Sequence, residues 1–178
     1  MKREKCQLLV VDIQEGFIPV MDEIERVISN SVILLEAANG LNVPITISEQ
    51  YPKGLGGTVS EINSSAVDAK IFSKSHFNCM KDQVLAEQFA KLQRNQVVIC
   101  GIEAHVCVLQ TAIGLVESGF DVFVVADCVS SRRQESVTLA FDRLQNTGVN
   151  IVSTEMVIFE WLEVAGTNEF KQISKLIK

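Results

Sequence analysis

The chain has 178 residues, 47% of them hydrophobic, and a formal net charge of −6 at pH 7. This length and composition predict one globular domain over residues 1–178 with a full apolar core, and they exclude a disordered or low-complexity protein. The negative charge argues against nucleic acid or an anionic membrane as the main partner.

The first half of the chain alternates predicted strands with helices. Residues 7–12 form a near-continuous apolar run, which is typical of a parallel strand buried on both faces. Asp22 then caps a helix that runs to residue 39, and a second strand covers residues 43–48. Residues 49–63 are polar and rich in glycine, which predicts a long loop, and residues 69–73 form a short third strand.

The second half continues the same alternation to the end of the chain. The predicted elements are a helix over 82–93, a strand over 97–100, a helix closed by Gly119, a strand over 121–127, a helix over 134–145, a strand over 149–153 and two tail helices over 154–164 and 168–177. This order predicts an α/β fold, in which helices cover both faces of a doubly wound, six-stranded parallel sheet. The expected strand order is 3-2-1-4-5-6 in a three-layer α/β/α arrangement.

Cys107 is the first candidate functional residue, because it falls where the helix after residue 101 begins. The apolar positions of this helix predict one buried stripe that leaves Cys107 outside it; they are Val106, Leu109, Ile113 and Val116. A thiol in a first helical turn meets unpaired N–H groups and the positive end of the dipole, which lower its pKa and favour a nucleophile. A small buried cysteine is the structural alternative, and this stretch alone does not distinguish the two.

Two charged residues end predicted strands. Asp12 closes the first strand and Lys74 follows the third. Since ligands of open α/β sheets bind at the carboxyl ends of the strands, Asp12, Lys74 and Cys107 are expected to converge there. The structural alternatives are a turn cap for Asp12 and a solvated edge residue for Lys74.

Three motifs resemble those of the isochorismatase-like cysteine hydrolases, in order and in spacing. They are Val-Val-Asp12-Ile-Gln14-Glu-Gly-Phe17, Lys74-Ser-His-Phe77-Asn78 and Gly101-Ile-Glu-Ala-His-Val-Cys107. Residues 49–56 and 125–132 look most like the small isochorismatase-domain-containing branch. The resemblance implies a triad in which Cys107 attacks a carbonyl, Asp12 is the general base and Lys74 sits between them.

The resemblance implies further parts of the site. A cis peptide bond is expected at Ile102–Glu103, with the backbone N–H groups of Glu103 and Cys107 forming an oxyanion hole. Gln14, Phe17 and Phe77 match family positions near the pocket, and Glu49 begins the loop that we expect to select the substrate. The family's nicotinamidases carry an Asp-x-His metal motif where this chain has Ser48-Glu49-Gln50, so neither a metal nor another cofactor is expected.

The leading hypothesis is a metal-free cysteine hydrolase that cleaves a carboxamide-type C–N bond of a small molecule through a thioester. A non-enzymatic binding or scaffold protein that retains the fold is the alternative. A redox-sensing thiol protein is less well supported because no resolving cysteine is close in sequence. A dinucleotide-binding protein is less well supported because no Gly-rich turn follows the first strand.

The compartment and the oligomeric state are also expectations at this stage. No apolar run approaches the ~20 residues of a membrane span, and the first residues lead into a strand rather than a signal peptide. Five cysteines without a CxxC pair indicate reduced thiols in the cytoplasm. The resemblance implies a homo-oligomer, and the apolar segment around Trp161 either forms a subunit contact or docks onto its own core.

Overall fold

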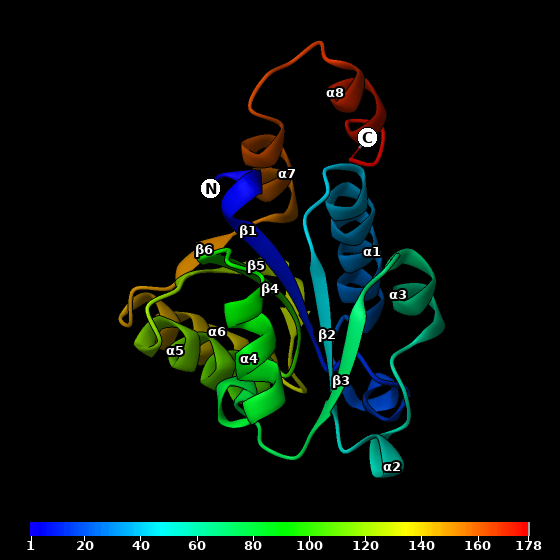
Figure 1. The fold of residues 1–178 in the computed structure, drawn as a ribbon. Coiled ribbons are helices and arrows are strands. Elements are labelled where there is room, and N and C mark those ends of the chain that lie inside the picture. The colour runs from blue at the N-terminus through cyan, green and yellow to red at the C-terminus, as the bar shows by residue number, and fades with distance from the viewer. Residues whose placement is uncertain (178) are drawn as a thin grey trace.

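A six-stranded parallel sheet in the order β3-β2-β1-β4-β5-β6 organises the computed structural model, which describes residues 1–177 (Figure 1). The strands are β1 (Cys6–Val11), β2 (Ile45–Gln50), β3 (Lys70–Lys74), β4 (Gln96–Ile102), β5 (Asp121–Ser130) and β6 (Asn150–Val152). Every neighbouring pair is parallel, so helices must carry the chain back across the faces of the sheet. The predicted fold class and strand order are confirmed.

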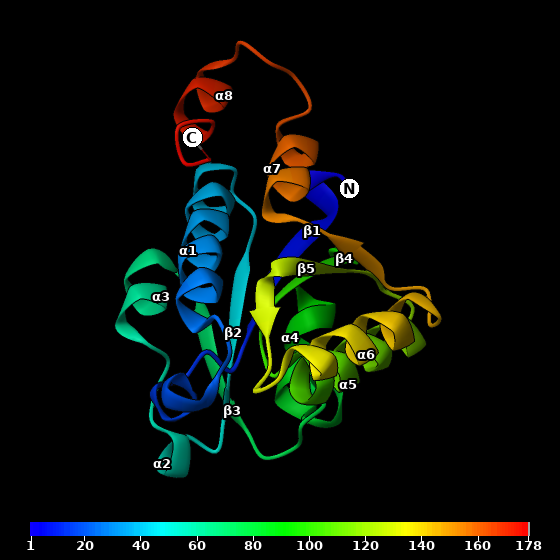
Figure 2. The ribbon, with the colours of Figure 1, turned by 180° about the vertical axis from the view of Figure 1, so that it is seen from behind.

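Side chains of β1 alternate between two apolar cores, one on each face of the sheet. Leu8 and Val10 pack into one core, and Leu9 and Val11 pack into the other. Burial on both faces explains why this strand is a continuous apolar run. The first core lies under α1 (Ile24–Gly40), α3 (Ser60–Ser65), α7 (Thr154–Leu162) and α8 (Asn168–Ile173). The second lies under α4 (Gln83–Lys91), α5 (Leu109–Glu117) and α6 (Gln134–Gln145), and Figure 2 shows these two layers from behind.

The start of α1 differs from the prediction. The helix begins at Ile24, its cap position is Glu23 at φ 44°, and no side chain caps it, so the prediction of Asp22 as N-cap is wrong. The reason is tertiary, because the Asp22 N–H donates to the Ser131 carbonyl (3.0 Å) and its own carbonyl accepts from the Ser130 hydroxyl (2.6 Å). Asp22 therefore joins the end of β5 rather than the helix.

The segment predicted as a loop over residues 49–63 is partly ordered into regular elements. Its first residues complete β2, Pro52–Leu55 form the single-turn helix α2, and α3 begins at Ser60. Proline at the first helical position suits the helix start, because it has no N–H to leave unpaired. Residues 49–63 are therefore an ordered segment rather than a free loop.

The carboxyl ends of β1 and β4 lie unusually close together. Gly101 has φ +127°, and a Cβ atom there would meet the Val11 carbonyl oxygen at 2.0 Å. Beside it, β5 advances from Val124 to Val129 while β4 advances only from Ile99 to Gly101, which is a bulge in the pairing. The close approach brings the residues that follow β1 beside those that follow β4.

The C-terminal helices dock onto the chain's own core. Trp161, on α7, is 1% exposed and packs into the first core, so this residue docks onto the chain's own core. Met156 and Phe159, on the same helix, stay exposed. In the part of the chain from residue 1 to 177, no helix combines the length and apolar character needed to cross a bilayer.

Candidate active site

Three elements bring the predicted triad to one edge of the sheet. Asp12 directly follows β1, Lys74 is the last residue of β3, and Cys107 lies in a π-helical turn (Ala104–Val108) that leads into α5. Strand β2 separates β1 from β3, so the long lysine side chain must cross the end of β2 to reach Asp12. The sequence expectation that these ends converge therefore agrees with the geometry.

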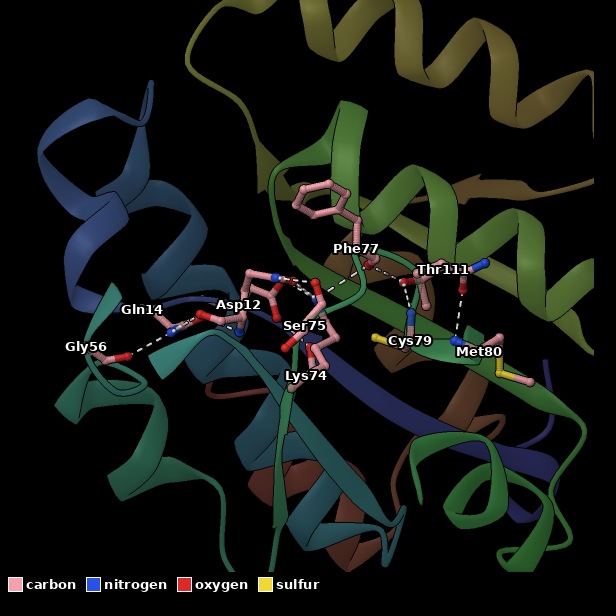
Figure 3. A network of polar contacts seen from close by, with 12 residues as sticks. Asp12, Gln14, Gly56, Lys74, Ser75, Phe77, Cys79, Met80 and Thr111 are labelled. Carbon is pink, nitrogen blue, oxygen red and sulfur yellow. Dashed lines mark hydrogen bonds and ion pairs between the residues drawn. The ribbon is translucent and has the colours of Figure 1, made fainter. Parts of the chain in front are cut away.

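Asp12 and Lys74 form a fully buried ion pair (Figure 3). The Lys74 Nζ donates to Asp12 Oδ2 and to Gln50 Oε1, both at 2.7 Å. The Ser48 hydroxyl donates to the other carboxylate oxygen, Asp12 Oδ1, at 2.7 Å. Because both charges have lost water, these contacts replace hydration and hold the carboxylate in one orientation.

Cys107 lies on the buried face of its helix, contrary to the predicted stripe. It is 4% exposed and packs in the core with Ala112 and Leu115, whereas Ile113 and Val116 are only partly buried. Since α5 is apolar around most of its circumference, the three-and-four spacing does not select a single face. The π-helical turn before α5 also shifts the phase of the first residues.

The pKa of the Cys107 thiol is raised, not lowered as its place in a first turn suggested. Burial is the main cause, the negative charge of Asp12 is the second, and the nearby Lys74 ammonium lowers the pKa too little to offset them. Burial and the nearby Asp12 charge therefore favour the neutral thiol over the thiolate at rest. A base is needed to release its proton, and the Asp12 carboxylate is close enough to act on the thiol.

The two charged partners are tuned in a way that suits proton transfer. Burial raises the pKa of Asp12 against the lowering effect of Lys74, which makes this carboxylate a stronger base than an exposed aspartate. Burial lowers the pKa of Lys74, but the negative charge of the neighbouring Asp12 raises it, and the net shift is upward. Lys74 is thus a permanent ammonium in this site.

A second polar network ties α5 to the segment after β3. The Cys79 N–H donates to the Thr111 Oγ1 at 3.0 Å, and the Thr111 hydroxyl lies 3.4 Å from the Phe77 carbonyl. The Lys74 Nζ is also 3.4 Å from that carbonyl (Figure 3). Sequence reasoning missed Thr111, although its place four residues after Cys107 puts both on one helix face. Ser48 and Gln50, two residues apart at the end of β2, were also missed.

The residues expected to contact substrate lie in different surroundings. The Gln14 amide donates to the carbonyls of Gln50 (3.1 Å) and Gly56 (2.7 Å), and its oxygen accepts from the Gln50 N–H (2.7 Å). The Glu49 carboxylate accepts from both the N–H and the hydroxyl of Thr58, at 2.8 Å. These contacts commit both side chains to the protein itself.

The two aromatic residues of this set differ in exposure. Phe17 packs partly against the core. Phe77 is 51% exposed, and its ring points away from the polar network (Figure 3). Among the four residues expected to contact substrate, Phe77 is therefore the one with a large exposed surface beside the triad.

The turn between β4 and Cys107 has an unusual backbone. The peptide bond joining Ile102 to Glu103 is cis. The Glu103 carboxylate pairs with Arg132 Nε at 2.9 Å, which links this turn to the segment after β5. Across residues 1–177, no three His, Cys, Asp or Glu side chains come together as metal ligands.

Comparison with known proteins gives a consistent result. The family profile described as Isochorismatase domain matches residues 6–156. Isochorismatase domain-containing protein 2 of Danio rerio is 40% identical over 170 residues, which cover 96% of this chain and 85% of that protein. The secreted isochorismatase effector Isc1 of Phytophthora sojae is 42% identical over 175 residues, covering 96% of this chain and 83% of that protein. Since that relative is named as secreted, the cytoplasmic location of this chain stays a prediction.

A solved structure supports the same grouping. The structure of the MAR1 ribonuclease from Caenorhabditis elegans superposes with a TM-score of 0.94 at 35% identity, over 99% of this chain and 91% of that one. The agreement extends over the whole sheet and both helix layers rather than over a single motif. The chain therefore belongs to the isochorismatase-like family of hydrolases, in the branch of the isochorismatase domain-containing proteins.

Proposed function

We propose that this chain is a cysteine hydrolase that cleaves a carboxamide-type C–N bond of a small molecule through a thioester on Cys107. One observation carries the proposal. A buried Asp12–Lys74 ion pair and a buried thiol that feels the charges of both residues meet at the carboxyl edge of the sheet. A nucleophile, a base and a fixed positive charge in one dry site are the parts that acyl transfer needs.

In the acylation step, the Cys107 sulfur attacks the substrate carbonyl carbon while Asp12 takes the thiol proton. The negative oxygen of the tetrahedral intermediate is stabilised by the backbone N–H groups of Glu103 and Cys107. The C–N bond then breaks, and Asp12 returns the proton to the leaving nitrogen, which departs as an amine or as ammonia. The acyl group remains on Cys107 as a thioester.

In the deacylation step, Asp12 removes a proton from water, which attacks the thioester carbonyl. The product leaves as a carboxylic acid, and the proton on Asp12 returns to the sulfur, so the resting state is restored. Lys74 keeps Asp12 oriented and balances its charge in the step when it is ionised. No metal and no other cofactor takes part in this scheme.

The remaining site residues have supporting roles in the proposal. Gln14 and Glu49 hold residues 49–58 in place through the contacts described above. We assign both side chains to positioning the residues that select the substrate. Phe77 and Phe17 supply apolar contacts to the substrate. A homo-oligomer in the cytoplasm remains our expectation for the assembly, and light scattering after size-exclusion chromatography tests the oligomer.

A polynucleotide substrate is the second activity to weigh, because the C. elegans neighbour is named a ribonuclease. The net charge of −6 and the burial of the only lysine in the site favour a small molecule instead. RNA is therefore one arm of the test.

The test is turnover of a panel of amides, ureides, imides and a single-stranded RNA by the wild type and by Cys107→Ala. We expect amide turnover that Cys107→Ala lowers by about 10⁴-fold or more. Intact mass after acid quenching should show an acyl adduct on the wild type only. Cys100→Ala is the matched control, because Cys100 is a buried thiol of β4 outside the polar site.

Two results would contradict the proposal. Ligand binding without turnover, unaffected by Cys107→Ala, would favour the scaffold alternative. Cleavage of RNA that depends on Cys107, with no turnover of any small molecule, would favour the ribonuclease activity.

A further inference from the structure

A cavity of about 410 Å³ is lined by His105, Arg132, Arg133 and Ser136. His105 lies two residues before Cys107 in the π-helical turn, and the other three come from the segment between β5 and the first turn of α6. None of the four has a part in the scheme proposed above. The cavity is large enough for a small ligand group together with water.

The charges around this cavity do not cancel. Arg132 pairs with Glu103 at 2.9 Å, so one positive charge is balanced. Among residues 1–177, Arg133 makes no ion pair, and its guanidinium is exposed at the cavity wall. The cavity is therefore net positive on a chain whose overall charge is −6.

The other lining groups offer hydrogen bonds that suit an oxyanion. The His105 Nδ1 lies 2.9 Å from the Ser131 hydroxyl, which leaves Nε2 as the ring nitrogen available to a ligand. Ser136 contributes a hydroxyl donor. No side chain caps the start of α6, where Arg133 occupies the cap position, so the positive end of the helix dipole also lies at this cavity.

We propose that this cavity binds an acidic group of the substrate, a carboxylate or a phosphate, with Arg133 as its ionic partner. The inference rests on the proposed function and narrows it, since the substrate is then a small carboxamide that carries an anion. Arg132 connects the two regions, because it holds Glu103, whose backbone N–H is a proposed donor to the reacting carbonyl oxygen. The anion anchors one end of the substrate while the carbonyl lies at Cys107.

The first test measures anion binding without any turnover. Inorganic phosphate and malonate are titrated calorimetrically at constant ionic strength against the wild type, Arg133→Gln, Arg133→Lys and Arg143→Gln. Arg143 is the matched control, because it is an exposed arginine of the same helix outside the cavity. We expect saturable binding that Arg133→Gln weakens about tenfold, that Arg133→Lys largely retains and that Arg143→Gln leaves unchanged.

The choice between the two probes identifies the group, since a preference for malonate points to a carboxylate and a preference for phosphate to a phosphoryl group. Absence of saturable binding, or equal weakening by Arg133→Gln and Arg143→Gln, overturns the inference.

The second test connects the cavity to Cys107. Iodoacetate and iodoacetamide alkylate a thiol by the same displacement of iodide and differ mainly in charge. Peptide mass spectrometry gives the rate with iodoacetate divided by the rate with iodoacetamide at Cys107. This ratio should fall about fivefold in Arg133→Gln, the effect expected for one unit charge a few ångströms from the iodoacetate carboxylate. Arg143→Gln should leave the ratio unchanged.

The two proposals fail in different ways in this test. An unchanged ratio in Arg133→Gln overturns the subsite while leaving the nucleophile intact. A wild-type Cys107 that reacts with neither reagent overturns the proposed function and the substrate subsite together, and the phosphate titration then shows separately whether the cavity is an anion site.

Discussion

Replacing Lys74 with methionine tests the electrostatic design of the site. Lys74→Met preserves the length of the side chain but removes the ammonium that donates to Asp12 and Gln50 at 2.7 Å. Asp12 would keep only the Ser48 hydroxyl as a donor in the described network, within a site that is closed to water. An unpaired carboxylate in such surroundings is strongly unfavourable.

The size of the effect follows from the burial of the pair. Breaking a buried ion pair by removing one partner costs about 3–5 kcal/mol. For a chain of this size, the melting temperature should fall by roughly 6–20 °C. Part of the loss is avoided if Asp12 binds a proton, so the destabilisation must depend on pH.

The direction of the pH dependence is determined by Asp12. Burial already raises its pKa in the folded state, and Lys74 opposes that rise. Without Lys74 the folded-state pKa lies further above the unfolded value of about 3.9. In Lys74→Met, the preference of the folded state for the protonated Asp12 carboxyl stabilises the protein. This stabilisation is fully present below the unfolded pKa of Asp12 and is lost as pH rises through its folded pKa. The deficit of Lys74→Met relative to the wild type should therefore grow as pH rises above the folded-state pKa of Asp12 in the wild type, which itself lies above the unfolded value.

Urea denaturation at several pH values between 5 and 8 measures this deficit. Lys171→Met, at an exposed lysine of α8, is the matched control and should leave stability nearly unchanged. The double variant Asp12→Asn/Lys74→Met has neither charge of the pair, so its stability should lack the pH dependence that Asp12 contributes. A deficit below about 1 kcal/mol at pH 7, or one that shrinks as pH rises, would refute the reasoning.

Two further predictions concern the backbone near the site. Gly101→Ala should destabilise the protein by about 3 kcal/mol or more, because it combines φ +127° with a 2.0 Å clash against the Val11 carbonyl. Gly119→Ala, at φ +87° with open space around it, should cost only about 1–2 kcal/mol; equal thermal shifts for the two variants would count against the close approach of β1 and β4. Thr111→Val leaves the buried Cys79 N–H without its acceptor and should cost about 1–3 kcal/mol and slow turnover. Thr111→Ser should restore both, and a serine variant no better than valine in urea denaturation and in turnover would exclude the hydrogen bond as the cause.

The strands were predictable because local patterns indicate them, and their order was predictable from the likeness to known doubly wound folds. The run at residues 7–12 could be identified as a doubly buried strand from its composition alone, and β1 places its alternate side chains in two cores as such a strand must. The convergence of Asp12 and Lys74 followed from strand ends that share one edge. Gly119 and Gly148 mark helix ends with positive φ, as turn chemistry requires.

The microenvironments were not predictable in the same way. Asp22 is a good cap residue by type, yet contacts with the end of β5 draw it away from α1. The segment predicted as a loop over residues 49–63 holds α2 and the start of α3, and Gln14 anchors it from a distance in sequence. Local propensity contains no information about such partners.

The sequence by itself determined the α/β class and predicted the three candidate reactive groups, because periodicity and motif spacing are properties of neighbouring residues. Only the tertiary structure decided how those groups behave: Cys107 is a protonated thiol, Asp12 is a strengthened base and Lys74 is a fixed ammonium. The physical reason is that a pKa depends on burial and on charges a few ångströms away. In this chain those charges come from strands and helices that are dozens of residues apart.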